Sequence, residues 1–252
     1  MKTMIITGAS SGIGKATALF AAQNGWQVTA TGRNRARLEE LASQHGNIRY
    51  LQFDITDPEA CQAALADQRF DATILNAGTC EYVDVDDWEP DMFKRVFDAN
   101  FFGVVNCLDA LLPGMTKGDQ LVFVDSLARL LPFTRSQAYG ASKAALHYLG
   151  KVMEVDLADR GVKVQCVSPG FVETPLTDKN TFKMPMRITA EQAAVSLLKA
   201  MERGSSSVYF PRVFSGLIRA LSSLPYSWQV SLCRRMKAAS ESTAQGGSSE
   251  AI

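Results

Sequence analysis

The chain lacks an excess of charge of either sign, with 26 lysines and arginines against 26 aspartates and glutamates. Proteins that bind nucleic acid usually carry a basic excess, so this balance argues against a nucleic-acid partner. The sequence has only two histidines, and its five cysteines form no Cys-x-x-Cys pair. We therefore predict no metal site, and we interpret the odd number of widely spaced cysteines as reduced thiols.

Targeting and membrane signals are also absent. The N-terminus runs almost directly into a short apolar segment, with none of the basic and apolar regions of a secretory signal peptide. No uninterrupted apolar run approaches the roughly 20 residues that a membrane span needs. We therefore predict a cytoplasmic protein. Its 252 residues are enough for one large α/β domain.

Apolar runs alternate with helical patterns along most of the chain, up to about residue 210. Strands at this spacing with helices between them predict a single-domain, Rossmann-type, doubly wound parallel sheet of about seven strands, with helices on both faces. The expected strands span residues 4–7, 26–31, 48–53, 71–75, 121–124, 162–167 and 206–210. The expected helices span residues 15–24, 34–45, 88–112, 137–158 and 189–203, and another begins at Pro58. Such sheets bind ligands at the carboxyl ends of their strands.

A glycine-rich turn follows the first expected strand and reads Gly8-Ala9-Ser10-Ser11-Gly12-Ile13-Gly14. Glycines let the backbone approach a pyrophosphate, and the N-terminus of the following helix supplies free N–H groups and positive potential. The spacing is Gly-x3-Gly-x-Gly, which differs from the more usual dinucleotide fingerprint. The turn therefore predicts a phosphate site, and the alternative is a glycine turn with no ligand.

Arg33 stands just past the second expected strand, where an NAD-binding unit usually has an acidic residue for the ribose 2′-hydroxyl. A guanidinium suits the 2′-phosphate of NADP instead, and Asn34 can add a hydrogen bond. The sequence thus favours NADP(H) over NAD(H). The alternative is an ordinary surface arginine.

Tyr139 and Lys143 are four residues apart on an expected helix, and this spacing puts both side chains on one face. An ammonium beside a phenol favours the phenolate, so we predict a lowered pKa for Tyr139 and a role in proton transfer. Ser126 ends the fifth expected strand, and Asn100 lies inside an expected helix. Taken singly, these residues have plain alternatives: a packed ring, a solvated amine, a helix cap and a buried amide that binds backbone.

The ordered set of motifs resembles the compact, single-domain branch of the short-chain dehydrogenase/reductase family. The resemblance covers residues 1–210. It rests on the glycine-rich turn, on Asn76-Ala77-Gly78 after the fourth strand, on Pro169-Gly170 and Thr174, and on a catalytic tetrad in the family's order: Asn100, Ser126, Tyr139 and Lys143. One departure stands out, because Leu127-Ala128-Arg129 follows the serine where members often carry a small polar residue.

The resemblance implies NADP(H)-dependent hydride transfer between the nicotinamide and a carbonyl or secondary alcohol. Tyr139 would be the general acid or base, Lys143 would lower its pKa and hold the nicotinamide ribose, Ser126 would bind the substrate oxygen, and Asn100 would hold a relay water. The resemblance also implies a homodimer or homotetramer formed through the helices at 88–112 and 137–158. The residues expected to bind the cofactor are Gly8, Ser10, Ser11, Gly12, Ile13, Gly14, Arg33, Asn34, Asp54, Ile55, Asn76, Ala77, Gly78, Tyr139, Lys143, Pro169, Gly170, Val172 and Thr174.

The C-terminal part differs from the rest in composition. Residues 211–237 are apolar and basic, with Pro225 dividing them into two expected helices, and residues 238–252 are rich in serine, glycine and alanine, which predicts disorder. The stretch 213–236 could lie on a membrane surface, cover the substrate pocket, form a dimer interface or simply pack on the domain. Two alternatives to a cytoplasmic reductase follow: a NADPH-binding regulatory protein without turnover, and a membrane-surface reductase of a lipid-like substrate.

Overall fold

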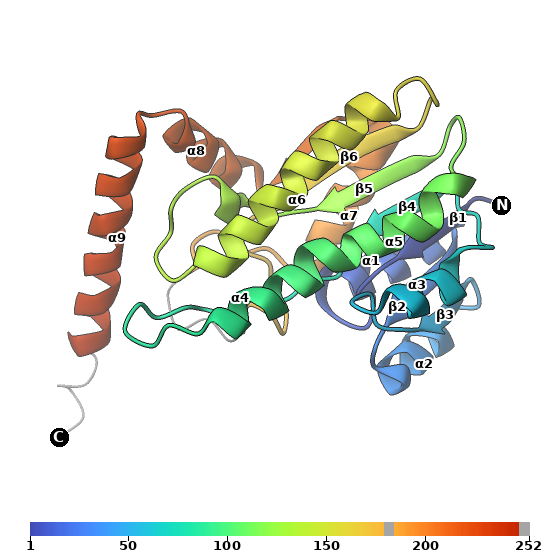
Figure 1. The fold of residues 1–252 in the computed structure, drawn as a ribbon, viewed down its shortest axis with the longest axis horizontal. Helices are drawn as coiled ribbons and strands as arrows, with labels where there is room; N and C mark the ends of the chain where they lie inside the picture. Colours follow the sequence, from blue (N-terminus) through green and yellow to red (C-terminus); the bar gives the residue numbers. More distant parts are fainter. Residues whose placement is uncertain (179–183, 247–252) are drawn as a thin grey trace.

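A computed structural model describes residues 1–178 and 184–246 of the chain. These residues form a seven-stranded sheet with the strand order β3-β2-β1-β4-β5-β6-β7, in which all neighbouring strands are parallel (Figure 1). The strands are β1 (Thr3–Ile6), β2 (Gln27–Gly32), β3 (Ile48–Gln52), β4 (Ala72–Leu75), β5 (Gln120–Val124), β6 (Lys163–Pro169) and β7 (Ser207–Phe210). The predicted Rossmann-type fold is confirmed.

Helices cover both faces of the sheet. One apolar core joins the sheet to α1 (Gly12–Gln23), α2 (Arg35–Ser43) and α7 (Ala190–Arg203). The other core joins the opposite face to α3 (Pro58–Leu65), α5 (Gly103–Leu111) and α6 (Gln137–Asp156). In β1 the side chains alternate between the two cores: Met4 and Ile6 point to the first and Ile5 to the second. A strand buried on both faces explains why its sequence is continuously apolar.

The long helix expected over residues 88–112 is interrupted in its middle. Helix α4 (Pro90–Phe97) leads into a π-helical turn, Asp98–Phe102, and α5 follows directly. A π turn holds one residue more than a regular helical turn and is frequent at functional sites. Here it contains Asn100, whose side chain is fully buried.

The stretch from Pro90 to Gly114 also meets the length and hydropathy of a membrane-crossing helix, although the sequence shows no uninterrupted apolar run of that length. Within its most apolar window, 44% of the residues are buried inside the protein. A core helix of a soluble protein passes the same test, so this feature is no argument for a membrane span.

Two further helices follow β7 and lie at the end of the molecule opposite β3 and α2 (Figure 1). They are α8 (Arg212–Ser222) and α9 (Tyr226–Gly246), and they separate at Pro225 as the sequence predicts. Helix α9 runs to Gly246, into the segment from residue 238 onward for which the sequence predicts disorder, and that disorder stays a prediction. The rest of the predicted tail, residues 247–252, lies outside the described residues.

Candidate active site

The glycine-rich turn joins β1 to α1 in a backbone conformation that needs glycine. Gly8 and Gly12 have φ values of +66° and +53°, in the left-handed region. A Cβ atom on Gly14 would lie 2.4 Å from the carbonyl oxygen of Gly8 and 2.6 Å from Nδ2 of Asn76. The turn therefore leaves no room for a side chain at position 14.

The N-terminus of α1 points its first N–H groups out of this turn. Ser11 is its N-cap residue, and within the described part of the chain its side chain makes no capping hydrogen bond. The first amides of α1 thus remain available to an anion. Ser10, Ser11, Gly12 and Ile13 are all partly exposed. Together with the close approach at Gly14, this surface fits the pyrophosphate of a dinucleotide.

Asn76, at the end of β4, fixes the turn to the sheet. Its Nδ2 donates to the carbonyl oxygens of Thr7 and Gly8, at 3.0 and 3.3 Å. The hydroxyl of Thr7 accepts from the backbone N–H groups of Asn76 and Ala77, both at 3.0 Å. The predicted Asn-Ala-Gly motif therefore lies directly against the glycine-rich turn.

Arg33 follows β2 and is open to solvent, with 78% of its side chain exposed. Its Nη1 lies 3.5 Å from Oδ2 of Asp54, which stands two residues beyond β3 and which the sequence assigns to the same site. Asn34 is the N-cap of α2 and accepts a hydrogen bond from the amide of Arg37 at 3.0 Å. Ile55 is buried, with its side chain against Gly103. Of these four, Ile55 is the one whose side chain is buried away from a ligand.

Tyr139 meets Ser126 at the ends of α6 and β5. The Ser126 hydroxyl lies near enough to the Tyr139 phenol to affect its pKa, and it also accepts from the amide of Ala128 at 3.1 Å. Burial raises the pKa of Tyr139 well above its ordinary value of 10, Cys80 and Asp125 raise it further, and the Ser126 hydroxyl opposes the rise. The predicted lowering of this pKa is thus wrong for the free protein, because burial disfavours the phenolate more than nearby groups favour it.

Lys143 lies one helical turn beyond Tyr139 and is also buried. Its ammonium donates to the carbonyl oxygen of Val124 at 2.9 Å. Burial lowers the pKa of Lys143 to about 8, although Asp125 and Cys80 act in the opposite direction. The amine therefore binds the end of β5.

Asn100 uses its amide on protein groups. Its Nδ2 donates to the carbonyl oxygen of Thr79 at 2.9 Å and to the hydroxyl of Ser142 at 3.0 Å, and its Oδ1 accepts from the amide of Thr79 at 2.7 Å. A Cβ atom on Gly78 would lie 2.8 Å from this Oδ1 and 3.3 Å from Nζ of Lys143. Glycine at position 78 is what lets Asn100 and Lys143 approach each other.

The loop after β6 turns back over the glycine-rich turn. Gly170 donates to the carbonyl oxygen of Phe210 at 2.7 Å, just beyond Pro169 at the strand end. Val172 is buried, whereas Thr174 lies against the turn, because a Cβ atom on Gly12 would be 3.0 Å from its methyl group. The structure thus brings the loop with the expected cofactor-binding residues Pro169, Gly170 and Thr174 onto the predicted phosphate site. Residues 179–183, which come next in the sequence, lie outside the described residues.

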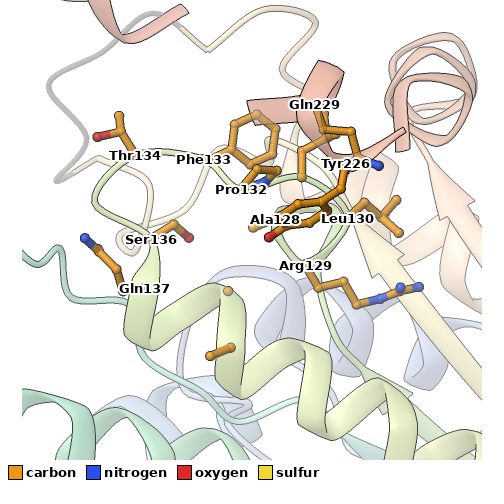
Figure 2. A pocket seen from close by; sticks show the side chains of 13 residues that line it. Ala128, Arg129, Leu130, Pro132, Phe133, Thr134, Ser136, Gln137, Tyr226 and Gln229 are labelled. Carbon is orange, nitrogen blue, oxygen red and sulfur yellow. The ribbon is translucent and has the colours of Figure 1, made fainter. Parts of the chain in front are cut away.

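A cavity of about 470 Å³ lies between the chain that follows Ser126 and helix α9 (Figure 2). It is formed by residues 128–134, 136 and 137, by Gly140 and Ala141 of α6, and by Tyr226 and Gln229 of α9. Gly140 and Ala141 lie on a different face of α6 from Tyr139 and Lys143. The cavity therefore lies beside the tyrosine, and Tyr139 itself is not among the residues that line it.

The sequence analysis missed a cluster of buried charged groups behind Ser126. Oδ2 of Asp125 lies 2.6 Å from Nδ1 of His147 and 3.4 Å from Nε of Arg129. The sulfur of Cys166 is also close, since the ligand atoms of Asp125, His147 and Cys166 lie within 4.8 Å of one another. A signal did exist, because His147 follows Lys143 by four residues and so shares its face of α6.

Known proteins resemble this chain over most of its length. The family model described as short chain dehydrogenase matches residues 2–184. An uncharacterized oxidoreductase of Myxococcus xanthus is 32% identical over 247 residues, covering 94% of this chain and 98% of that protein. The serine 3-dehydrogenase of Agrobacterium fabrum is 35% identical over 188 residues, covering 69% of this chain and 74% of that enzyme. A short-chain dehydrogenase from Sphingobium yanoikuyae, solved in complex with NADPH, shares the fold, with a TM-score of 0.77 at 23% identity over 89% of this chain and 97% of that one.

Proposed function

The chain belongs to the short-chain dehydrogenase family, and we propose that it is an NADP(H)-dependent oxidoreductase that interconverts a carbonyl compound and an alcohol. The observation that carries the proposal is the proximity of the Tyr139 and Ser126 hydroxyl groups at the rim that also holds the glycine-rich turn. Two hydroxyl groups that converge beside a dinucleotide site can both bind one substrate oxygen. When bound, the nicotinamide supplies or accepts the hydride.

The raised pKa of Tyr139 supports a role as proton donor. A phenol whose pKa lies above 10 stays protonated at neutral pH, so it enters the reaction able to protonate a carbonyl oxygen. Ser126 would donate a hydrogen bond to the same oxygen as negative charge develops there. Lys143, whose pKa is about 8, is largely protonated at neutral pH, and its charge would stabilise the phenolate that remains after proton transfer.

Asn100 supports this arrangement through the start of α6. Its amide binds the hydroxyl of Ser142, which in turn donates to the carbonyl oxygen of Tyr139 at 2.8 Å. The residue thus holds the turn of α6 that carries the tyrosine. A water held by Asn100, as the family resemblance implies, stays a prediction.

Arg33 supports the preference for NADP(H). Its side chain is exposed beside the turn and its ion pair with Asp54 is long, at 3.5 Å, so the guanidinium can reorient toward a phosphate. A loosely paired surface arginine at this point suits the 2′-phosphate better than the 2′-hydroxyl.

The test is a pair of tyrosine variants on one helix. A panel of ketones, aldehydes and alcohols is first screened for oxidation of NADPH or reduction of NADP. With any substrate found, Tyr139→Phe should lower kcat by at least roughly a hundredfold, the scale of a lost general acid, while the Kd for NADPH is retained. Tyr148→Phe is the matched control, because Tyr148 is also on α6 and its side chain is 74% exposed. Full activity of Tyr139→Phe would refute the mechanism.

The second candidate, a NADPH-binding regulatory protein, predicts a different result. Such a protein would bind NADPH tightly and turn over no member of the panel. The raised pKa of Tyr139 and its contact with Ser126 favour the enzyme, because a binding protein needs neither. Membrane association through residues 213–236 and assembly into a dimer or tetramer stay predictions.

A further inference from the structure

The charged groups behind Ser126 are held in the interior of the protein. The side chain of Asp125 is fully buried and that of Arg129 is only 9% exposed, although each carries a charge. Both are near the end of β5: Asp125 directly precedes Ser126, and Arg129 ends the short 3₁₀ helix that follows it, Leu127–Arg129. The third member, His147, comes from α6 and is 18% exposed.

A buried ion pair of this kind contributes little net stability to a fold. The free energy needed to remove two charges from water is comparable with their attraction inside the protein, so apolar residues of similar volume would serve the fold equally well. Only one of the two carboxylate oxygens of Asp125 is paired. Its Oδ2 lies against Arg129 and His147, whereas its Oδ1 has no hydrogen-bond partner within the described ranges. Since stability does not explain why Asp125 and Arg129 are buried, their position beside the active site has to.

We propose that Asp125 is a positioning residue of the active site, which acts through Arg129 and His147 to fix Ser126 against the helix that carries Tyr139 and Lys143. The proposal rests on the proposed function. Asp125 is held on the sheet by its own amide, which donates to the carbonyl oxygen of Val167 at 2.8 Å. Its carboxylate then pairs with Arg129, three residues after Ser126, and with His147 on α6. Ser126 is thus flanked in the chain by two residues, Asp125 and Arg129, that are both held in place.

Arg129 closes the short turn around the serine. Its amide donates to the carbonyl oxygen of Ser126 at 3.3 Å, and its Nη2 donates to the hydroxyl of Ser168 at 3.4 Å. In Figure 2 its side chain runs away from Tyr226, on the opposite side of the cavity-lining chain. The guanidinium thus ties the turn to β6 as well as to Asp125.

The same guanidinium argues against a metal ion among Asp125, His147 and Cys166. It lies 3.4 Å from the carboxylate oxygen that a metal would use, and it already supplies the positive charge there. The cluster is therefore better explained as a fixed arrangement of protein charges than as a cation site.

The carboxylate of Asp125 also acts on the two proton-carrying residues. Asp125 contributes to raising the pKa of Tyr139 and, against burial, that of Lys143. The other groups that face these residues are Cys80, which acts in the same direction on both, and the Ser126 hydroxyl on Tyr139. Facing Asp125 itself are Arg129, His147 and Cys166. Removal of the Asp125 charge should therefore lower the pKa of both Tyr139 and Lys143.

The experiment replaces Asp125 by its neutral isostere in the full chain. Asp125→Asn should move the titration of Lys143 to a pH below the wild-type midpoint of about 8, as followed by NMR of isotope-labelled lysine side chains and assigned with Lys143→Met. This readout needs no substrate, so it stands even if the proposed reaction is wrong. With a substrate, kcat should fall by roughly ten- to a hundredfold, which is the scale of the loss when catalytic groups are slightly misplaced. The alkaline limb of the pH profile of kcat should also move to lower pH. Asp67→Asn, an identical change at an exposed residue, should alter neither quantity.

A second variant keeps the test decisive if Asp125→Asn leaves Arg129 buried without its partner and unfolds the protein. In Asp125→Asn/Arg129→Gln both charges are removed together, which is the tolerated way to replace a buried pair. It should fold, bind NADPH with the wild-type Kd and show the same lower Lys143 midpoint and lower kcat. A folded variant with the wild-type midpoint and the wild-type kcat would overturn the proposal.

Discussion

Gly14 offers the sharpest test of how the cofactor turn is built. A Cβ atom at this position would meet the Gly8 carbonyl oxygen at 2.4 Å and Asn76 Nδ2 at 2.6 Å, and Ala9 Cα at 3.0 Å. Two of these partners are backbone atoms, and the third is an amide that holds the turn to β4. Gly14→Ala therefore forces the turn away from the sheet. Overpacking of a tight site destabilises by about 1–3 kcal/mol, and loss of the two Asn76 hydrogen bonds adds about 1 kcal/mol each, so we expect about 3–5 kcal/mol in all.

The assay combines urea unfolding, followed by circular dichroism, with titration of NADPH by fluorescence. Gly14→Ala should lower the unfolding midpoint and weaken NADPH binding at least about tenfold, because the displaced amides no longer meet the pyrophosphate. Gly216→Ala is the matched control, since Gly216 lies in helix α8 with no atom within 4 Å of the added methyl group. It should stabilise the protein by about 0.5–1 kcal/mol through helix propensity alone. An unchanged midpoint and Kd in Gly14→Ala would refute this account of the turn.

Two further predictions concern charge. Arg33→Ala should raise the Kd for NADPH by roughly tenfold or more and leave the Kd for NADH unchanged. Arg37→Ala, on the exposed side of α2, is the control and should change neither Kd. Equal losses of affinity for both cofactors would contradict the assignment of Arg33 to the 2′-phosphate. Lys143→Met should stabilise the fold below about pH 8, where the ammonium is buried against its preference, by on the order of 3 kcal/mol. Since the unfolded lysine stays protonated up to about pH 10.5, the wild type gains stability as the pH rises from about 8, and the advantage of the variant should vanish toward pH 10.5 in urea titrations. A constant difference across that range would show that Lys143 is not buried as described.

The sheet and its functional edge were predictable because both follow from local rules. Apolar runs such as that of β1 are buried on two faces, and a parallel sheet brings all their carboxyl ends to one edge. The start of α3 was equally local: Pro58 opens its first turn as predicted, and Asp57 before it accepts hydrogen bonds from the amides of Glu59 and Ala60.

The pKa of Tyr139 and the buried charges of Asp125 and Arg129 were not predicted correctly, because they depend on burial, which cannot be read directly from a sequence. The spacing of Tyr139 and Lys143 predicts their common face, but not that burial would raise the tyrosine pKa. Asp125 and Arg129 have the composition of surface residues, and their burial becomes evident only when β5, α6 and β6 are assembled.

The π turn at Asp98–Phe102 sets α4 and α5 out of step by one residue. A chain shortened by any single residue there could return to regular helical bonding, and the side chain of Asn100 would swing by about 100° around the helix axis. The amide would then part from Thr79 and Ser142 together. Insertions and deletions among natural relatives should accordingly occur in the connecting loops and avoid the π turn. A deletion there would give a more regular helix but would remove the hydrogen bond of Asn100 to Ser142 of α6.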